Sequence, residues 1–173
     1  NRQLLHPGGN IREKKVASAE EKLAEINPDI TIRTIEAHLD EGNAERLVGK
    51  ADGIVDALDN YPARYLLNRV ALRKGIPLFH GAIQGMFGQA TTIIPGKTPC
   101  LACIFPKPPP AEIFPVVGVT PGLIGAIQAT EVLKFRLGEG ELLKGRLLLW
   151  DGMHSQASEV CVERNPSCGV CGD

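Results

Sequence analysis

The sequence predicts an α/β fold in which a mainly parallel sheet is flanked by helices, extended by antiparallel strands and closed by a four-cysteine zinc clasp. A strand, a helix and a second strand follow one another between residues 53 and 79, which is a βαβ unit. The last two predicted strands have no long helix between them, which favours antiparallel pairing there. Two Cys-x-x-Cys motifs, one in the middle of the chain and one at its end, supply the clasp.

The first predicted elements are a helix and a strand. Apolar residues recur at helical spacing over residues 16–26, and Asn27-Pro28 ends the pattern. Ile30 and Ile32 alternate with polar neighbours, which predicts a half-buried strand.

The βαβ unit comes next, after a short helical piece at residues 44–48. Residues 53–58 form a short, largely apolar run of the kind found in a parallel strand covered on both faces. Pro62 suits the first turn of a helix, Gly75 suits its end, and residues 76–79 read as the following strand.

The remaining elements complete the sheet. We predict further strands at residues 89–94, 146–150 and 159–163, and residues 121–137 carry an apolar helical face that ends at Gly138.

The four paired cysteines are Cys100, Cys103, Cys168 and Cys171, and this spacing is typical of a closed tetrahedral zinc site. Two disulfides or four free thiols are the alternatives. Disulfides need an oxidising compartment, no signal peptide is visible, and Cys161 would be left over. Iron in the same site would make a redox module instead. Because four sulfur ligands leave no open position, we interpret the site as structural.

Composition indicates a globular chain and excludes two classes of partner. The 173 residues are 43% hydrophobic, and 19 basic against 20 acidic residues give a net charge of -1. That charge gives no reason to expect nucleic-acid or anionic-membrane binding. The longest weakly polar stretch, residues 116–127, is broken by glycine and proline and is too short to span a bilayer. The chain starts at Asn1 and not at Met, so we expect a segment upstream.

One acidic pair lies where ligands bind in open parallel sheets. Asp59-Asn60 follows the predicted strand, so the Asp59 carboxylate is placed to hold magnesium. Either residue alone is more often a helix N-cap, and Asn60 can fill that role. Alternation points Asp56 to the opposite face, where a buried carboxylate would need hydrogen bonds.

Basic residues and histidines add weaker candidates. Arg2 and Lys15 are candidate phosphate ligands, although a lone basic residue is usually solvated surface. The four histidines are dispersed, so they predict neither a metal site nor a nucleophile–base pair, and only His80, just past a strand, is a candidate. Neither a Walker loop nor a Gly-x-Gly-x-x-Gly fingerprint occurs in these residues.

Short motifs in a specific order carry a family resemblance. They lie at residues 1–6, 15–19, 26–28, 56–60, 99–103, 121–125, 128–131 and 165–171. With these motifs the chain resembles the ThiF/MoeB/HesA family of ubiquitin-like-protein activating, E1-like adenylyltransferases.

The resemblance implies a Rossmann-like fold and an activity. Residues 1–173 would be the C-terminal portion of a ThiF-type adenylation domain whose glycine-rich nucleotide loop lies upstream. Such an enzyme uses ATP and magnesium to adenylate the C-terminal glycine of a small β-grasp ubiquitin-like or sulfur-carrier protein ending in Gly-Gly, and it releases pyrophosphate.

Residue roles follow from the matching motifs. Arg2 would contact the β- and γ-phosphates, often across a dimer interface, which implies a homodimer. Lys15, in preference to its neighbour Lys14, would contact the α-phosphate, and Asp59 would hold magnesium. The four paired cysteines would bind zinc. The nucleotide-binding set implied is Asn1, Arg2, Gln3, Lys15, Asp59 and Asn60.

One departure from the family narrows the activity. Members that form thioesters carry a cysteine after the first knuckle, where this chain has residues 110–114 without one. This favours adenylation alone, and we interpret Cys161, on a predicted strand, as a core residue.

Two rival functions remain. One is a non-catalytic zinc-stapled scaffold that pairs with a competent subunit, although retention of the candidate phosphate and magnesium ligands argues against it. The other is a nicotinamide-dependent oxidoreductase. The predicted sheet would suit that class of enzyme, but this chain lacks the glycine fingerprint of the class. Thiolates and the lack of a signal suggest the cytoplasm. The carrier protein and its pathway are not specified by the sequence.

Overall fold

The computed structural model describes residues 5–6, 14–108 and 115–172, which belong to two compact units, Asn1–Leu39 and Asp40–Asp173. In the first unit, α1 (Lys15–Ile26) ends where the Asn27 N–H donates to the Leu23 carbonyl at 3.0 Å. The predicted strand at Ile30 and Ile32 is wrong. No strand is assigned to the described part of this unit, and the Ile30 side chain is 53% exposed.

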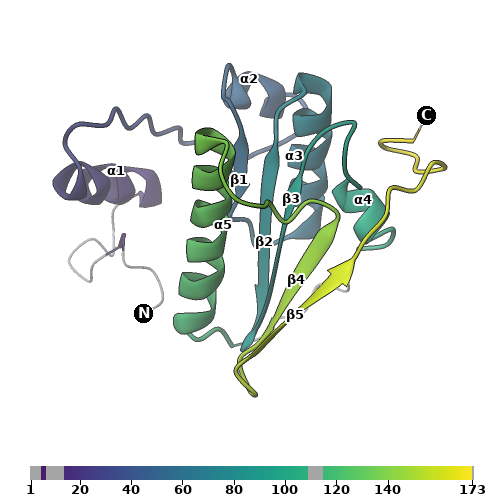
Figure 1. The fold of residues 1–173 in the computed structure, drawn as a ribbon. Helices are drawn as coiled ribbons and strands as arrows, with labels where there is room; N and C mark the ends of the chain where they lie inside the picture. Colours follow the sequence, from purple (N-terminus) through teal and green to yellow (C-terminus); the bar gives the residue numbers. More distant parts are fainter. Residues whose placement is uncertain (1–4, 7–13, 109–114, 173) are drawn as a thin grey trace. The chain divides into compact units, whose positions relative to one another are not determined.

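The second unit is built on one five-stranded sheet with the order β1-β2-β3-β4-β5 (Figure 1). Its strands are β1 (Ile54–Asp56), β2 (Leu78–Gln84), β3 (Phe87–Ile93), β4 (Arg146–Asp151) and β5 (Gln156–Cys161). β1 and β2 are parallel, and the other three pairs are antiparallel. The predicted α/β class with a mixed sheet is therefore confirmed, and the antiparallel part among the described residues is larger than expected.

Four helices accompany this sheet in the described part of the unit. They are α2 (Ala44–Val48), α3 (Tyr61–Lys74), α4 (Leu101–Ile104) and α5 (Val119–Leu137). The sequence predicted all but α4, which is a single turn inside the first cysteine motif. None of the described helices is long and apolar enough to cross a membrane.

The two long helices cover opposite faces of the sheet. Phe79 on β2 packs its ring against Phe135 of α5, with the centroids 5.8 Å apart. The next residue, His80, contacts Asp56, which forms an ion pair with Arg64 of α3. Because neighbouring side chains on a strand point to opposite faces, α5 lies on one side and α3 on the other. The result is a helix–sheet–helix layering, as predicted (Figure 1).

Two glycines allow α5 to approach the sheet closely. A Cβ atom at Gly81 would lie 2.5 Å from the Gln128 side chain, and one at Gly88 would lie 2.5 Å from Ile124. Gln128 cannot move away freely, because its Nε2 donates to the carbonyls of Asp56 at 2.8 Å and Phe79 at 2.9 Å. Glycine is therefore required at these positions by packing.

We predict that Gly81→Ala lowers the free energy of unfolding by about 1–3 kcal/mol, the usual cost of overpacking a tight interior. The matched control is Gly125→Ala on the exposed side of α5, where an added Cβ meets nothing within 4 Å. That change should raise stability by about 0.5–1 kcal/mol, since alanine is the better helix former. Urea denaturation of the full-length protein measures both. Equal stability of the two variants would show that Gln128 yields to the new methyl group.

Candidate functional site

Asp59 and Asn60 occupy the loop between β1 and α3. The Asn60 side-chain oxygen accepts the Ala63 N–H at 2.9 Å, so Asn60 is the N-cap of α3. Asp59 is exposed, and one of its oxygens accepts a hydrogen bond from Asn60 Nδ2 at 3.2 Å. The division of roles expected from the sequence is compatible with this geometry. Asn60 is used by the helix, while the Asp59 carboxylate faces solvent at the carboxyl end of a parallel strand.

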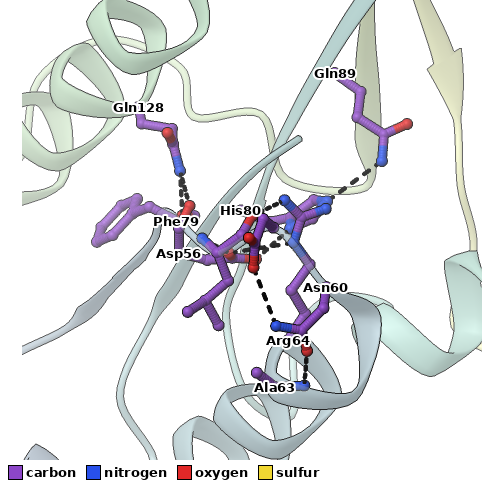
Figure 2. Close-up of polar contacts among 10 residues, drawn as sticks. Asp56, Asn60, Ala63, Arg64, Phe79, His80, Gln89 and Gln128 are labelled. Atoms are coloured by element: carbon purple, nitrogen blue, oxygen red, sulfur yellow. Dashed lines mark hydrogen bonds and ion pairs between the residues drawn. The ribbon is translucent and has the colours of Figure 1, made fainter. Parts of the chain in front are cut away.

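Directly behind this loop lies a buried polar network centred on Asp56 (Figure 2). Asp56 and His80 are register partners on the parallel strands β1 and β2, and both are fully buried. The Asp56 Oδ2 and His80 Nδ1 atoms are 2.6 Å apart. Since a carboxylate only accepts, Nδ1 donates, and His80 Nε2 is left to accept from Gln89 Nε2 at 3.4 Å.

The same network fixes the backbone that leads to Asp59. Asp56 Oδ1 accepts the Leu58 N–H at 3.2 Å, and a guanidinium nitrogen of Arg64 donates to the Leu58 carbonyl. Arg64 Nε also lies 3.4 Å from Asp56 Oδ1, within ion-pair range although without hydrogen-bond geometry. Leu58 is thus held by both its amide and its carbonyl. The hydrogen bonds that a buried Asp56 requires are therefore present.

The four paired cysteines converge near the middle of α3, where Asn68 accepts a hydrogen bond from the Leu101 N–H in the first cysteine motif. Their sulfur atoms all lie within 4.8 Å of one another. Cys100 Sγ is 4.0 Å from Cys103 and 3.9 Å from Cys168, and Cys103 is 3.4 Å from Cys171. A tetrahedron with metal–sulfur bonds of about 2.3 Å has edges of about 3.8 Å. The donor set and the spacing therefore fit one tetrahedral metal ion.

The environments of these thiols differ. Burial raises the pKa of Cys100 to about 12, although the Cys103 backbone and the Asn68 side chain act in the opposite direction. At Cys168 burial also acts to raise the pKa, but hydrogen bonds from the backbone of Cys171 and Val170 outweigh it and lower the pKa to about 7. A metal ion must therefore displace a tightly held proton from Cys100.

The other predicted site residues lie in the first unit or outside the described residues. Lys15 begins α1 and is exposed. No ion pair is found for Lys15 within the described ranges, whereas Lys14 pairs with Glu36 at 2.5 Å. Asn1, Arg2 and Gln3 fall outside the described residues. Residues 110–114 also fall outside the described residues. This is the segment in which thioester-forming members of the family carry a cysteine and this chain does not.

Sequence reasoning missed two polar residues of α3 and misjudged one cysteine. Arg64 and Asn68 are buried, at 6% and 0% exposure, and follow Asn60 at intervals of four. That spacing on an apolar helix face is the signal that could have found them. The prediction that Cys161 is a core residue is wrong, because it lies exposed on β5, whose residues are all exposed.

With this fold and site, the comparisons with known proteins identify the family. The model of the ThiF family matches residues 1–170, and the chain belongs to that family. It is 44% identical over 178 residues to the SAMP-activating enzyme E1 of Haloferax volcanii, covering 99% of this chain and 66% of the relative. It is 38% identical to the sulfur carrier protein adenylyltransferase of Thermus thermophilus, covering 100% of this chain and 68% of the relative.

Solved structures agree on the fold. Escherichia coli MccB, in a crystal structure with MccA-N7isoASN, superimposes with a TM-score of 0.86 at 19% identity, over 99% of this chain and 55% of MccB. The chain thus spans about two thirds of the two curated relatives and about half of the MccB structure.

We predict that Asp56→Ala lowers the free energy of unfolding by about 3–5 kcal/mol, because it leaves Arg64 and His80 buried without their acceptor. Asp59→Ala is the control, because Asp59 directly follows the held Leu58 but is exposed to solvent, and it should change stability by less than about 0.5 kcal/mol. Chemical denaturation of the full-length protein gives both values. A mild effect at Asp56 would mean that the network does not hold the loop.

Proposed function

We propose that this chain is the C-terminal portion of an adenylation domain, spanning residues 1–173, that activates the C-terminal glycine of a ubiquitin-like or sulfur-carrier protein. The observation that carries the proposal is the exposed Asp59 carboxylate at the end of β1, on a loop held by buried contacts. The names of the two curated relatives, an E1 and an adenylyltransferase, support it.

The proposed reaction needs positioning and charge neutralisation. A carboxylate oxygen of the carrier attacks the α-phosphorus of ATP, the bond to the pyrophosphate oxygen breaks, and an acyl-adenylate and pyrophosphate result. Magnesium, when bound, supplies positive charge between the phosphates. Asp59 is the residue that would hold it, Lys15 would neutralise the α-phosphate, and Arg2 the β- and γ-phosphates.

Further parts of the proposal concern assembly and environment. The Arg2 motif favours a homodimer in which one protomer completes the nucleotide site of its partner. Four metal-binding thiolates favour a reducing compartment, the cytoplasm. The metal proposed for the cluster of Cys100, Cys103, Cys168 and Cys171 is zinc, which prefers four thiolates in a tetrahedron and adds folding free energy without redox chemistry.

We predict that Lys15→Ala and Asp59→Ala each lower the rate of ATP–pyrophosphate exchange by a factor of about 10²–10³ or more, since each removes a charge that stabilises the transition state. The assay uses the full-length protein, radiolabelled pyrophosphate and candidate carriers that end in Gly-Gly. Exchange that depends on one carrier would also identify the substrate.

The matched control is Lys14→Ala, which removes an adjacent lysine that pairs with Glu36. Exchange should stay within about twofold of the parent, because an exposed ion pair contributes little. Wild-type exchange in Lys15→Ala or Asp59→Ala would refute the assigned role. If folded, metal-loaded protein showed no exchange with any carrier, the scaffold function would replace the enzymatic one.

We also predict one zinc ion per chain in a colourless preparation, measured by elemental analysis. Cys103→Ser or Cys171→Ser should abolish zinc binding. When free zinc is near a thousand times the Kd of the unmutated protein, each variant should therefore lose about 4 kcal/mol of the free energy of unfolding. Cys161→Ser is the control, because that exposed thiol lies on β5, outside the cluster, and its loss should change neither zinc content nor stability. Iron in the preparation, or zinc retained by both cluster variants, would contradict the assignment.

A further inference from the structure

Asn68 lies in the middle of α3, where a carboxamide is out of place. The residue is 0% exposed and is flanked on the buried side of the helix by Leu67, Val70 and Ala71. Burying an amide among apolar side chains is costly unless its oxygen and its nitrogen both find partners. The contacts of Asn68 should therefore account for both ends of the amide.

One end is accounted for. Asn68 Oδ1 accepts the Leu101 N–H at 3.0 Å. Because Leu101 offers a donor, the oxygen of the carboxamide must face it, and this fixes the orientation of the amide. The atom left over is Nδ2, which is buried and makes no hydrogen bond of ordinary geometry within the described residues.

The carboxamide that carries the unused donor lies beside one cysteine of the cluster. Leu101 directly follows Cys100, so the Asn68 carboxamide lies against the Cys100–Leu101 peptide, and the Asn68 side chain acts to lower the pKa of the Cys100 thiol. A thiol is a weak hydrogen-bond acceptor, whereas a metal-bound thiolate is a much stronger one.

We propose that Asn68 is an outer-sphere partner of the metal cluster, whose Nδ2 donates an N–H···S hydrogen bond to the Cys100 thiolate when the metal is bound. This inference rests on the metal site proposed above. Four thiolates around a divalent cation leave excess negative charge, and Cys100 is the one of the four with no solvent exposure. A protein donor at that sulfur replaces the water that cannot reach it.

The test compares three variants of the full-length protein. Asn68→Asp keeps an acceptor for Leu101 but removes the donor, and Asn68→Leu removes both at similar volume. Tyr65→Phe is the control, because it deletes another hydrogen bond between α3 and the segment around α4, from Tyr65 Oη to the Phe105 carbonyl at 2.5 Å, and leaves the Asn68 carboxamide in place. Zinc affinity is measured by competition with a chromophoric chelator, and the sulfur-to-metal charge-transfer band is recorded with cobalt.

Both Asn68 variants should raise the zinc Kd by about 10–100-fold, as loss of an outer-sphere partner does, and should shift the cobalt charge-transfer band. Tyr65→Phe should leave the band in place and change the Kd by less than the Asn68 variants. Wild-type affinity and an unshifted band in Asn68→Leu would overturn the proposal and leave Asn68 as an anchor of Leu101 alone. Failure of the unmutated protein to bind zinc would instead overturn the metal site itself.

A second measurement needs no variant and so does not depend on folding of a mutant. The wild-type protein is loaded with a cadmium isotope of nuclear spin one half, and through-bond coupling is sought between the metal and the side-chain amide protons of Asn68. Such coupling is transmitted across an N–H···S hydrogen bond. Its presence is the expected result, and its absence in a cadmium-loaded, folded sample would contradict the hydrogen bond.

Discussion

The buried carboxylate of Asp56 is the contact on which the second unit depends. It joins three elements, because it contacts His80 on β2, Arg64 on α3 and the Leu58 amide that follows β1. Its own carbonyl accepts from Gln128 on α5, so a fourth element meets the same residue. A buried ion pair is weak evidence for added stability, since desolvation offsets much of the attraction. Its clearer consequence is a single position for the loop that carries Asp59.

Helix α3 connects that loop to the cysteine cluster. Its first turn is capped by Asn60 beside Asp59, and Arg64 one turn later holds the Leu58 carbonyl. Another turn on, Asn68 holds the amide of Leu101 in the first cysteine motif. These three polar residues, spaced by four, form one row along the helix. A single rigid element therefore sets the positions of the candidate magnesium ligand and the candidate metal clasp.

Much of this could be predicted from the sequence because periodicity reports which residues are buried. The pattern located α1, α2, α3 and α5 and the strands of the sheet, and cysteine spacing located the cluster. Two predictions failed because an alternating sequence does not show whether another strand or helix packs against the segment. Ile30 and Ile32 alternate like a strand, but no strand pairs with them in the described residues. Cys161 is on a strand as expected, yet β5 is an edge whose side chains are exposed.

The spacing of Arg64 and Asn68 could have identified these residues, but their partners in the polar network could not be predicted from the sequence, for a related reason. The helical pattern shows that Arg64 and Asn68 lie on the apolar face of α3. A polar residue on that face can either extend to solvent at a helix end or be buried against a partner, and the pattern does not distinguish the two. Only the fold shows that β1 stops at Asp56, which brings a carboxylate within reach of Arg64, and that α4 turns the Leu101 amide toward Asn68. Because each partner lies on another element, burial of these side chains depends on the whole unit being folded. The same dependence makes them sensitive reporters of whether the loop of Asp59 and the cysteine cluster form together.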